Sequence, residues 1–112
     1  MNVPDISDLL GKPCDPYGVR GISCVGLVLE IYKRAGVILS DPYEDPDGAE
    51  KEWREVAQPE PGDLLGCLSA DGVTHYALFL GSNEYVHANE SSGVCVVTES
   101  DLPEGRFYRC LP

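Results

Sequence analysis

The stretch Gly-Ile-Ser-Cys-Val-Gly-Leu-Val-Leu-Glu-Ile-Tyr at residues 21–32 decides the fold prediction. Its apolar side chains recur every three or four residues, which is the spacing of one helical face. Ser23 stands directly before that pattern and is a favourable N-cap, because its hydroxyl can accept a hydrogen bond from a free amide of the first turn. Gly36 can adopt the left-handed conformation that commonly ends a helix. The sequence therefore predicts a buried helix that begins at Cys24.

Cys24 would lie in the first turn of this helix, at the positive end of its dipole. A helix N-terminus favours the thiolate, which is the nucleophilic form of cysteine. The alternative is that Cys24 is only a small buried apolar residue, which is the commoner role of a cysteine on an apolar helix face. The choice between a nucleophile and a core residue depends on what the rest of the chain can bring to it.

The composition is that of an acidic globular protein. The chain has 112 residues, of which 43% are hydrophobic, which is enough for one core, and we expect a single domain spanning residues 1–112. The formal net charge is -11, with only 8 lysines and arginines. Because nucleic-acid binding depends on clustered basic residues, this balance argues against a nucleic acid partner and equally against an anionic membrane surface.

The chain has an odd number of cysteines and no Cys-x-x-Cys pair; they are Cys14, Cys24, Cys67, Cys95 and Cys110. This spacing favours neither a zinc site nor a complete disulfide framework, and we expect no metal and no other cofactor. The first residues lack the basic and apolar segments of a signal peptide, and no apolar run approaches the roughly 20 residues of a membrane span. We therefore expect synthesis in the cytoplasm without a signal peptide.

Two further short helices are expected around the central one. The first covers residues 5–10, with Leu9 and Leu10 facing inward, and the second covers residues 49–57. Between the central helix and the second short helix, the acidic segment 41–48 is expected to be a solvated loop. A calcium site is disfavoured there, because its glycine and glutamate do not stand at the offsets of an EF-hand loop.

The pattern changes from helical to strand-like after residue 62, with turn residues between the apolar runs. The expected strands cover residues 63–68, 75–80, 84–88, 94–98 and 106–110. A cysteine-bearing helix followed by a run of strands predicts an α+β fold.

The two histidines of the chain fall in adjacent strands of one predicted hairpin. If the loop consists of residues 81–83, Leu80 lies opposite Glu84 and Ala77 lies opposite His87. His75 shares a face with Ala77, so the two histidines become diagonal neighbours about 7 to 8 Å apart at the backbone. A loop of two residues would place them on opposite faces unless a bulge intervened.

A thiol, a base beside it and a polar group that orients the base form the arrangement that activates a cysteine nucleophile. Cys24, His75 and His87 could supply these three parts. The alternative is that each histidine is half-buried with its nitrogens satisfied. A metal site would need a further cysteine or carboxylate, and no His-Glu-x-x-His spacing occurs.

Four short motifs, which run in order from about residue 12 to the C-terminus, resemble those of the NlpC-type family of papain-like cell-wall peptidases, the NlpC and p-sixty superfamily. They are Gly-Ile-Ser-Cys-Val-Gly-Leu-Val at 21–28, Pro-Gly-Asp-Leu at 61–64, His-Tyr-Ala-Leu-Phe-Leu-Gly at 75–81 and Tyr-Val-His-Ala at 85–88. The resemblance implies a papain-like fold, in which the cysteine-bearing helix packs on an antiparallel sheet of about five strands.

The resemblance also implies roles for individual residues. Cys24 would be the nucleophile, His75 its general base and then general acid, and His87 the residue that orients the His75 imidazole. The substrate would be the stem peptides of bacterial peptidoglycan. An alternative from thiol chemistry alone is acyl transfer or amide hydrolysis on another substrate, because the same chemistry serves several carbonyl acceptors.

Within the family, the chain looks most like the phage tail-associated members, because of its small size, its Gly-Lys-Pro at 11–13 and its ending Gly-Arg-Phe-Tyr-Arg at 105–109. This likeness implies other phage tail proteins as partners and a place in the virion at the tail tip. The enzyme would then act in the periplasm or cell wall.

Two positions depart from the family pattern. Ser23 stands where the family usually has aspartate, and serine caps a helix equally well. Cys14 stands where an aromatic residue commonly lies near the oxyanion, and Tyr17 is the candidate substitute, with Ser23 as a second residue toward the oxyanion or substrate. Losing an oxyanion donor typically costs about 100- to 1000-fold in rate, so the departures also suggest a non-catalytic structural tail-tip module.

Overall fold

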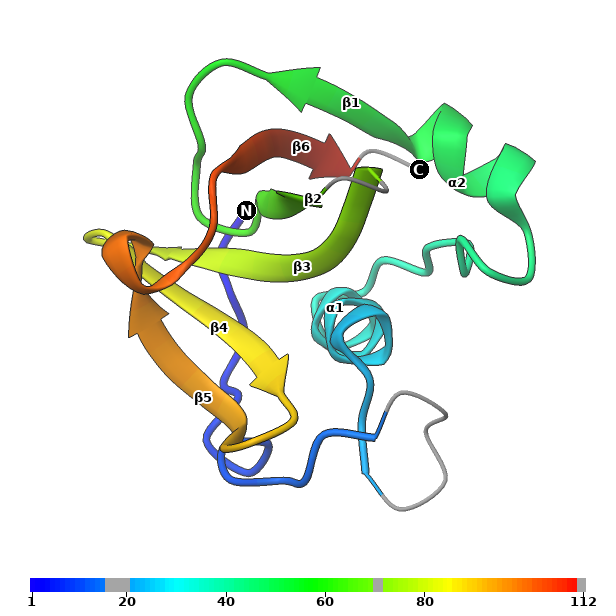
Figure 1. The fold of residues 1–112 in the computed structure, drawn as a ribbon. Helices are drawn as coiled ribbons and strands as arrows, with labels where there is room; N and C mark the ends of the chain where they lie inside the picture. The colour runs from blue at the N-terminus through cyan, green and yellow to red at the C-terminus, as the bar shows by residue number, and fades with distance from the viewer. Residues whose placement is uncertain (16–20, 70–71, 111–112) are drawn as a thin grey trace.

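The computed structural model describes residues 1–15, 21–69 and 72–110, with side chains omitted at 69 and 72–74. One helix packs on a six-stranded antiparallel sheet in the order β1-β6-β2-β3-β4-β5, as Figure 1 shows. The elements are α1 (Cys24–Arg34), α2 (Pro46–Glu52), β1 (Trp53–Val56), β2 (Leu64–Ser69), β3 (Gly72–Gly81), β4 (Glu84–Asn89), β5 (Gly93–Thr98), the 3-10 helix η1 (Glu99–Asp101) and β6 (Gly105–Cys110). The fold is therefore α+β, as predicted, with six strands where about five were expected.

Helix α1 begins and ends where its sequence predicts. The Ser23 hydroxyl oxygen accepts a hydrogen bond from the Gly26 amide at 2.9 Å, which caps the first turn. Gly36 follows the helix with a φ of 84°, the left-handed value that glycine adopts without a Cβ penalty. Cys24 is consequently the first residue of the helix.

The sheet has an apolar cluster on each face. Leu64, Leu78 and Val86 pack against α1 in the larger cluster. The alternate positions Leu65 and Ala77 join a smaller cluster on the other face.

The β3-β4 hairpin differs from the prediction at its tip. Gly81 pairs with Glu84, so the predicted pairing of Leu80 with Glu84 is wrong. The loop has two residues with positive φ, 51° at Ser82 and 65° at Asn83, which is the geometry of a tight hairpin turn. A register shift between Phe79 and Gly81 leaves one extra residue in β3, which compensates for a loop one residue shorter than predicted. The bulge thus preserves the register beyond it.

Of the two predicted short helices, the first is wrong and the second forms with shifted bounds. Residues 7–10 form only a turn, and Leu10 remains 44% exposed while Leu9 is 1% exposed. The second helix, expected at 49–57, begins earlier because Asp45 caps it through the Gly48 amide at 3.0 Å and Pro46 suits the first turn. It ends at Glu52 because residues 53–56 pair with β6 as strand β1. Long-range pairing overrides the local helical pattern there.

A buried ion pair ties the loop before β2 to β6. The Asp63 carboxylate, 5% exposed, accepts hydrogen bonds from Arg109 Nε at 3.1 Å and Nη2 at 2.9 Å. The Tyr32 hydroxyl of α1 donates to the Gly62 carbonyl oxygen of the same loop. The Pro-Gly-Asp motif at 61–63 therefore connects α1 to β6 through these hydrogen bonds. In the described part of the chain, no helix is long and apolar enough to cross a membrane.

Candidate active site

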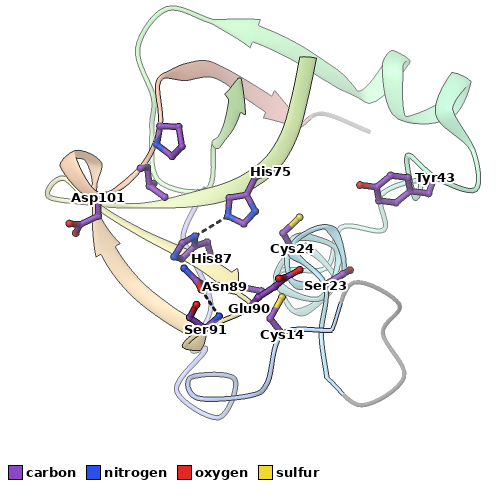
Figure 2. Close-up of a pocket in the computed structure, with 13 residues that line it drawn as sticks. Cys14, Ser23, Cys24, Tyr43, His75, His87, Asn89, Glu90, Ser91 and Asp101 are labelled. Carbon is purple, nitrogen blue, oxygen red and sulfur yellow. Dashed lines mark hydrogen bonds between the residues drawn. The ribbon is translucent and has the colours of Figure 1, made fainter. Parts of the chain in front are cut away.

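A pocket of about 640 Å³ opens beside the N-terminus of α1, and Figure 2 shows its lining side chains. The described residues that line it are Cys14, Ser23, Cys24, Tyr43, His75, His87, Ala88, Asn89, Glu90, Ser91, Asp101, Leu102 and Pro103. We call Cys24, His75 and His87 the Cys-His cluster. The rim consists of Cys14, Tyr43 and residues 89–91 and 101–103.

Cys24 is half-buried and lines the pocket from the first turn of α1. A cysteine that served only as core packing would be closed off from the pocket, which Cys24 is not. In Figure 2 its sulfur lies on the side of the pocket where the His75 ring enters. The structure therefore places the thiol where a molecule in the pocket can reach it.

The two histidines meet as predicted. His75 Nε2 lies 2.9 Å from His87 Nδ1, and the rings are nearly perpendicular with centroids 5.1 Å apart. This contact requires both side chains on one face of the sheet, which the bulge before Gly81 makes compatible with a two-residue loop. The prediction that His75 and His87 share a face is confirmed.

Burial keeps both rings neutral near neutral pH. Desolvation lowers the pKa of His75 below its usual value, and the neighbouring charge of His87 lowers it further. Desolvation also lowers the pKa of His87, which is 6% exposed. A hydrogen bond between two neutral imidazoles needs one donor and one acceptor. With the proton on His75 Nε2, that atom donates to His87 Nδ1. The lone pair of His75 Nδ1 is then available to accept a proton, so His75 can act as a base.

Ser23 lines the pocket as well as capping the helix. Its oxygen accepts from Gly26, and a hydroxyl can still donate its own hydrogen. A Cβ at position 26 would lie 2.9 Å from the Ser23 hydroxyl oxygen, so glycine at 26 leaves room for the cap. Tyr17, the other residue predicted near the oxyanion, lies outside the described residues.

Cys14 is held at the pocket by backbone hydrogen bonds of the two residues before it. The Ile22 amide donates to the Pro13 carbonyl at 2.9 Å, and the Val94 amide donates to the Lys12 carbonyl at 2.8 Å. Burial raises the pKa of the Cys14 thiol above its usual value, and the charge of Cys24 raises it further. Cys14 therefore stays protonated under conditions where a more exposed thiol would ionise.

Most of the rim was not predicted from the sequence. Residues 89–91 directly follow the His87 strand, and the Ser91 amide donates to Asn89 Oδ1 at 2.7 Å. Residues 101–103 approach from the far end of β5, and Tyr43 from the loop between α1 and α2. The position of 89–91 after His87 was a usable signal, whereas nothing local marks the other two segments.

The charged groups of the rim are acidic. Glu90 and Asp101 line the pocket, and no lysine or arginine does so among the residues whose placement is described. Asp101 is already engaged, because one of its oxygens accepts from the Thr98 amide at 3.1 Å. Nowhere in the described ranges do three or more histidine, cysteine or acidic side chains gather in a way that could hold a metal ion.

Comparison with known proteins gives one family. The model of the NlpC/P60 family matches residues 14–107 of the chain. The bifunctional muramidase/DL-endopeptidase CwlT of Bacillus subtilis is 28% identical over 88 residues, which are 76% of this chain and 25% of CwlT. The chain therefore spans about a quarter of that curated relative.

Solved structures share the fold. An NlpC/P60 family protein from Bacillus cereus superposes with a TM-score of 0.71 at 21% identity, over 98% of this chain and 41% of that one. The NlpC/p60 domain of the peptidoglycan hydrolase SagA superposes with a TM-score of 0.64 at 25% identity, over 93% of this chain and 91% of that one. The match to SagA extends over nearly the whole of both chains.

Proposed function

This chain belongs to the NlpC/P60 family, and on that premise we propose that it is a cysteine peptidase that hydrolyses the stem peptides of bacterial peptidoglycan. The observation that carries the proposal is the meeting of Cys24, His75 and His87 in one open pocket. The names of two similar proteins support the substrate class, since CwlT is a DL-endopeptidase and SagA a peptidoglycan hydrolase.

The geometry supports a two-step reaction. Cys24 Sγ attacks the carbonyl carbon of the peptide bond, and the thiol proton passes to His75. The C–N bond breaks as His75 returns this proton to the leaving amine, which leaves a thioester on Cys24. Water then attacks the thioester and gives a proton to His75, which passes it to the departing sulfur. The peptide acid is released and the thiol restored.

His87 acts through His75 rather than on the substrate. In the tautomer with the proton on His75 Nε2, that N–H donates a hydrogen bond to His87 Nδ1, and the bond favours the form of His75 whose Nδ1 is a base. The negative oxygen of the tetrahedral intermediate would be stabilised by the Cys24 amide, because the first amides of a helix lack acceptors within it. The Ser23 hydroxyl can add a second donor at the same end of α1.

The test uses purified sacculi and three proteins: the wild type, Cys24→Ala and His75→Ala. We expect soluble peptide fragments from the wild type and none above background from either variant. Thiol labelling with iodoacetamide is an internal control that measures the loss of the Cys24 thiol against the four cysteines that remain in Cys24→Ala. Wild-type activity in both variants would refute the assignment, and a wild type that releases nothing would favour the structural tail-tip module.

We also propose that residues 1–112 form one domain that works at the tail tip of a phage, together with other tail proteins, and acts in the periplasm or cell wall. The support is the likeness of the segments 11–13 and 105–109 to tail-associated members of the family. Mass spectrometry of purified virions from a strain carrying the gene tests this placement. Absence of the protein from intact particles that contain the other tail proteins would overturn the proposed location without affecting the peptidase proposal.

A further inference from the structure

Tyr43 is both highly exposed and part of the pocket lining. Its side chain is 76% exposed, more than any other large hydrophobic residue in the described part of the chain. It also lines the same pocket as Cys24 and His75. In Figure 2 it stands at the opposite end of the pocket from Asp101, with His87 and Cys24 between them. A side chain so exposed contributes little to the core.

The backbone presents this ring in an ordered turn. The Tyr43 amide donates to Asp41 Oδ1 at 2.8 Å, and the Asp45 amide donates to the Asp41 carbonyl at 2.7 Å. Asp45 in turn caps α2 through the Gly48 amide. These hydrogen bonds fix the turn at both ends. Little backbone conformational freedom is therefore lost when the ring contacts a ligand.

Another aromatic residue, Tyr76, stands next to the Cys-His cluster in the sequence of β3. Tyr76 follows His75 in β3, and its ring meets Trp53 edge-on with centroids 5.0 Å apart. Burial raises the pKa of Tyr76 to about 12, with smaller contributions from the charges of Tyr108, Tyr43 and Cys24. Among the described residues that line the pocket, Tyr43 rather than Tyr76 or Trp53 supplies the large aromatic surface.

The pocket has the polar Cys-His cluster in its middle and apolar side chains in two parts of its rim. His75, Cys24 and His87 form the middle, while Leu102 and Pro103 line one part of the rim and Tyr43 another. A peptide whose scissile carbonyl lies at Cys24 must extend in both directions from it. Apolar surfaces in these two parts of the rim can contact the chain on both sides of the bond.

We propose that Tyr43 is a substrate-positioning residue, whose ring packs on the peptide portion of the substrate to one side of the scissile bond. The inference rests on the proposed peptidase function and adds one subsite to it. Tyrosine offers a large rigid surface with few torsions to fix, which suits it to hold an extended peptide. Its contact forms before the reaction and persists through it, so it contributes to binding rather than to the chemical step.

The test compares Tyr43→Ala, Tyr43→Phe and the matched control Ile38→Ala. Ile38 is 72% exposed on the same connection between α1 and α2 and is not among the pocket-lining residues. The substrates are a free stem tetrapeptide and the same peptide carrying its disaccharide. We expect Tyr43→Ala to raise KM about 10-fold for both substrates with kcat nearly unchanged. Tyr43→Phe and Ile38→Ala should match the wild type.

Each other outcome overturns the inference. A KM in Tyr43→Ala equal to that of Ile38→Ala means that the ring does not bind substrate. A loss confined to the disaccharide-bearing substrate means that the ring contacts sugar instead of peptide. A fall in kcat at constant KM means that it acts in the chemical step. In all three cases the wild type turns over, whereas a wild type inactive on both substrates means that the proposed function itself fails.

Discussion

The Cys-His cluster and the rim border the same pocket but are built in different ways (Figure 2). Cys24, His75 and His87 lie on α1, β3 and β4, which pack together in the centre of the molecule. The rim residues lie mostly in turns and loops between elements. Regular elements fix side chains to within a fraction of an ångström, whereas loops tolerate sequence change. The difference suggests that the cluster sets the reaction and the rim selects the substrate.

The largest expected effect separates the two regions directly. His75→Ala should lower kcat by about 100- to 10,000-fold, because it removes the general base and acid. His87→Ala should cost less, since it removes only the group that orients His75. Rim substitutions such as Tyr43→Ala should instead raise KM. Steady-state kinetics on a soluble stem peptide measures both constants, and equal losses from the two histidine variants would contradict the orienting role.

A second prediction concerns the support of the cluster rather than its chemistry. Asp63→Asn should lower the free energy of unfolding by about 2 kcal/mol, because it removes the charge of a buried carboxylate from its hydrogen bonds. Arg109 is 29% exposed, so water screens part of the ion pair and the cost stays below that of a fully buried one. Urea denaturation followed by Trp53 fluorescence measures the change.

Activity gives the control for Asp63→Asn. Below the denaturation midpoint, kcat per folded molecule should stay near that of the wild type, because Asp63 does not line the pocket. A large loss of kcat in a fully folded variant would mean that the loop at 61–63 moves the Cys-His cluster, and the separation between support and chemistry would be wrong.

The cluster could be predicted from sequence because each part has a local signal. Ser23 and the apolar spacing locate the helix start, and strand alternation locates His75 and His87 on one face. The predicted pairing at the tip of the hairpin was wrong, because the sequence pattern does not distinguish a three-residue loop from a two-residue loop with a bulge at the same register. Both solutions give the same face for the histidines.

The rim and strand β1 could not be predicted, because tertiary contacts determine them. Residues 53–56 continue a helical pattern, and only their pairing with β6 makes them a strand. Tyr43 lies in an acidic segment that was expected to be merely solvated. Its proximity to Cys24 depends on how α1 sits on the sheet, which no local spacing encodes. Loops that meet only in the folded chain leave no periodic signal.

A third prediction uses the lowered pKa values of the two histidines. Because the pKa of His75 lies below 6.5 in the folded protein, kcat/KM should stay on its plateau below pH 6.5 and fall only as the pH drops through that lower value. Stability follows the same sign. The unfolded chain binds protons first as the pH falls below about 6.5, so the stabilisation is complete above that pH and is lost down to the folded pKa values.

The pH profile can be checked in two ways. The acid limb of kcat/KM for the wild type gives the first, and an acid limb centred above pH 6.5 would contradict neutral, desolvated rings. Urea unfolding between pH 7 and pH 5 gives the second. Its slope with pH should be shallower in His87→Asn, because asparagine takes up no proton there.

The smallest expected effect comes from Ser23, which belongs to both regions, since it caps α1 and lines the pocket. Ser23→Ala should cost about 1 kcal/mol of stability, because the Gly26 amide loses its acceptor. Ser23→Asp keeps an acceptor at the N-cap and should retain the stability. If the serine hydroxyl only caps, both variants should keep the wild-type kcat. If both lose kcat about 10-fold or more while Ser23→Asp remains stable, the hydroxyl donates to the reacting oxygen, and the boundary of the Cys-His cluster must be drawn to include it.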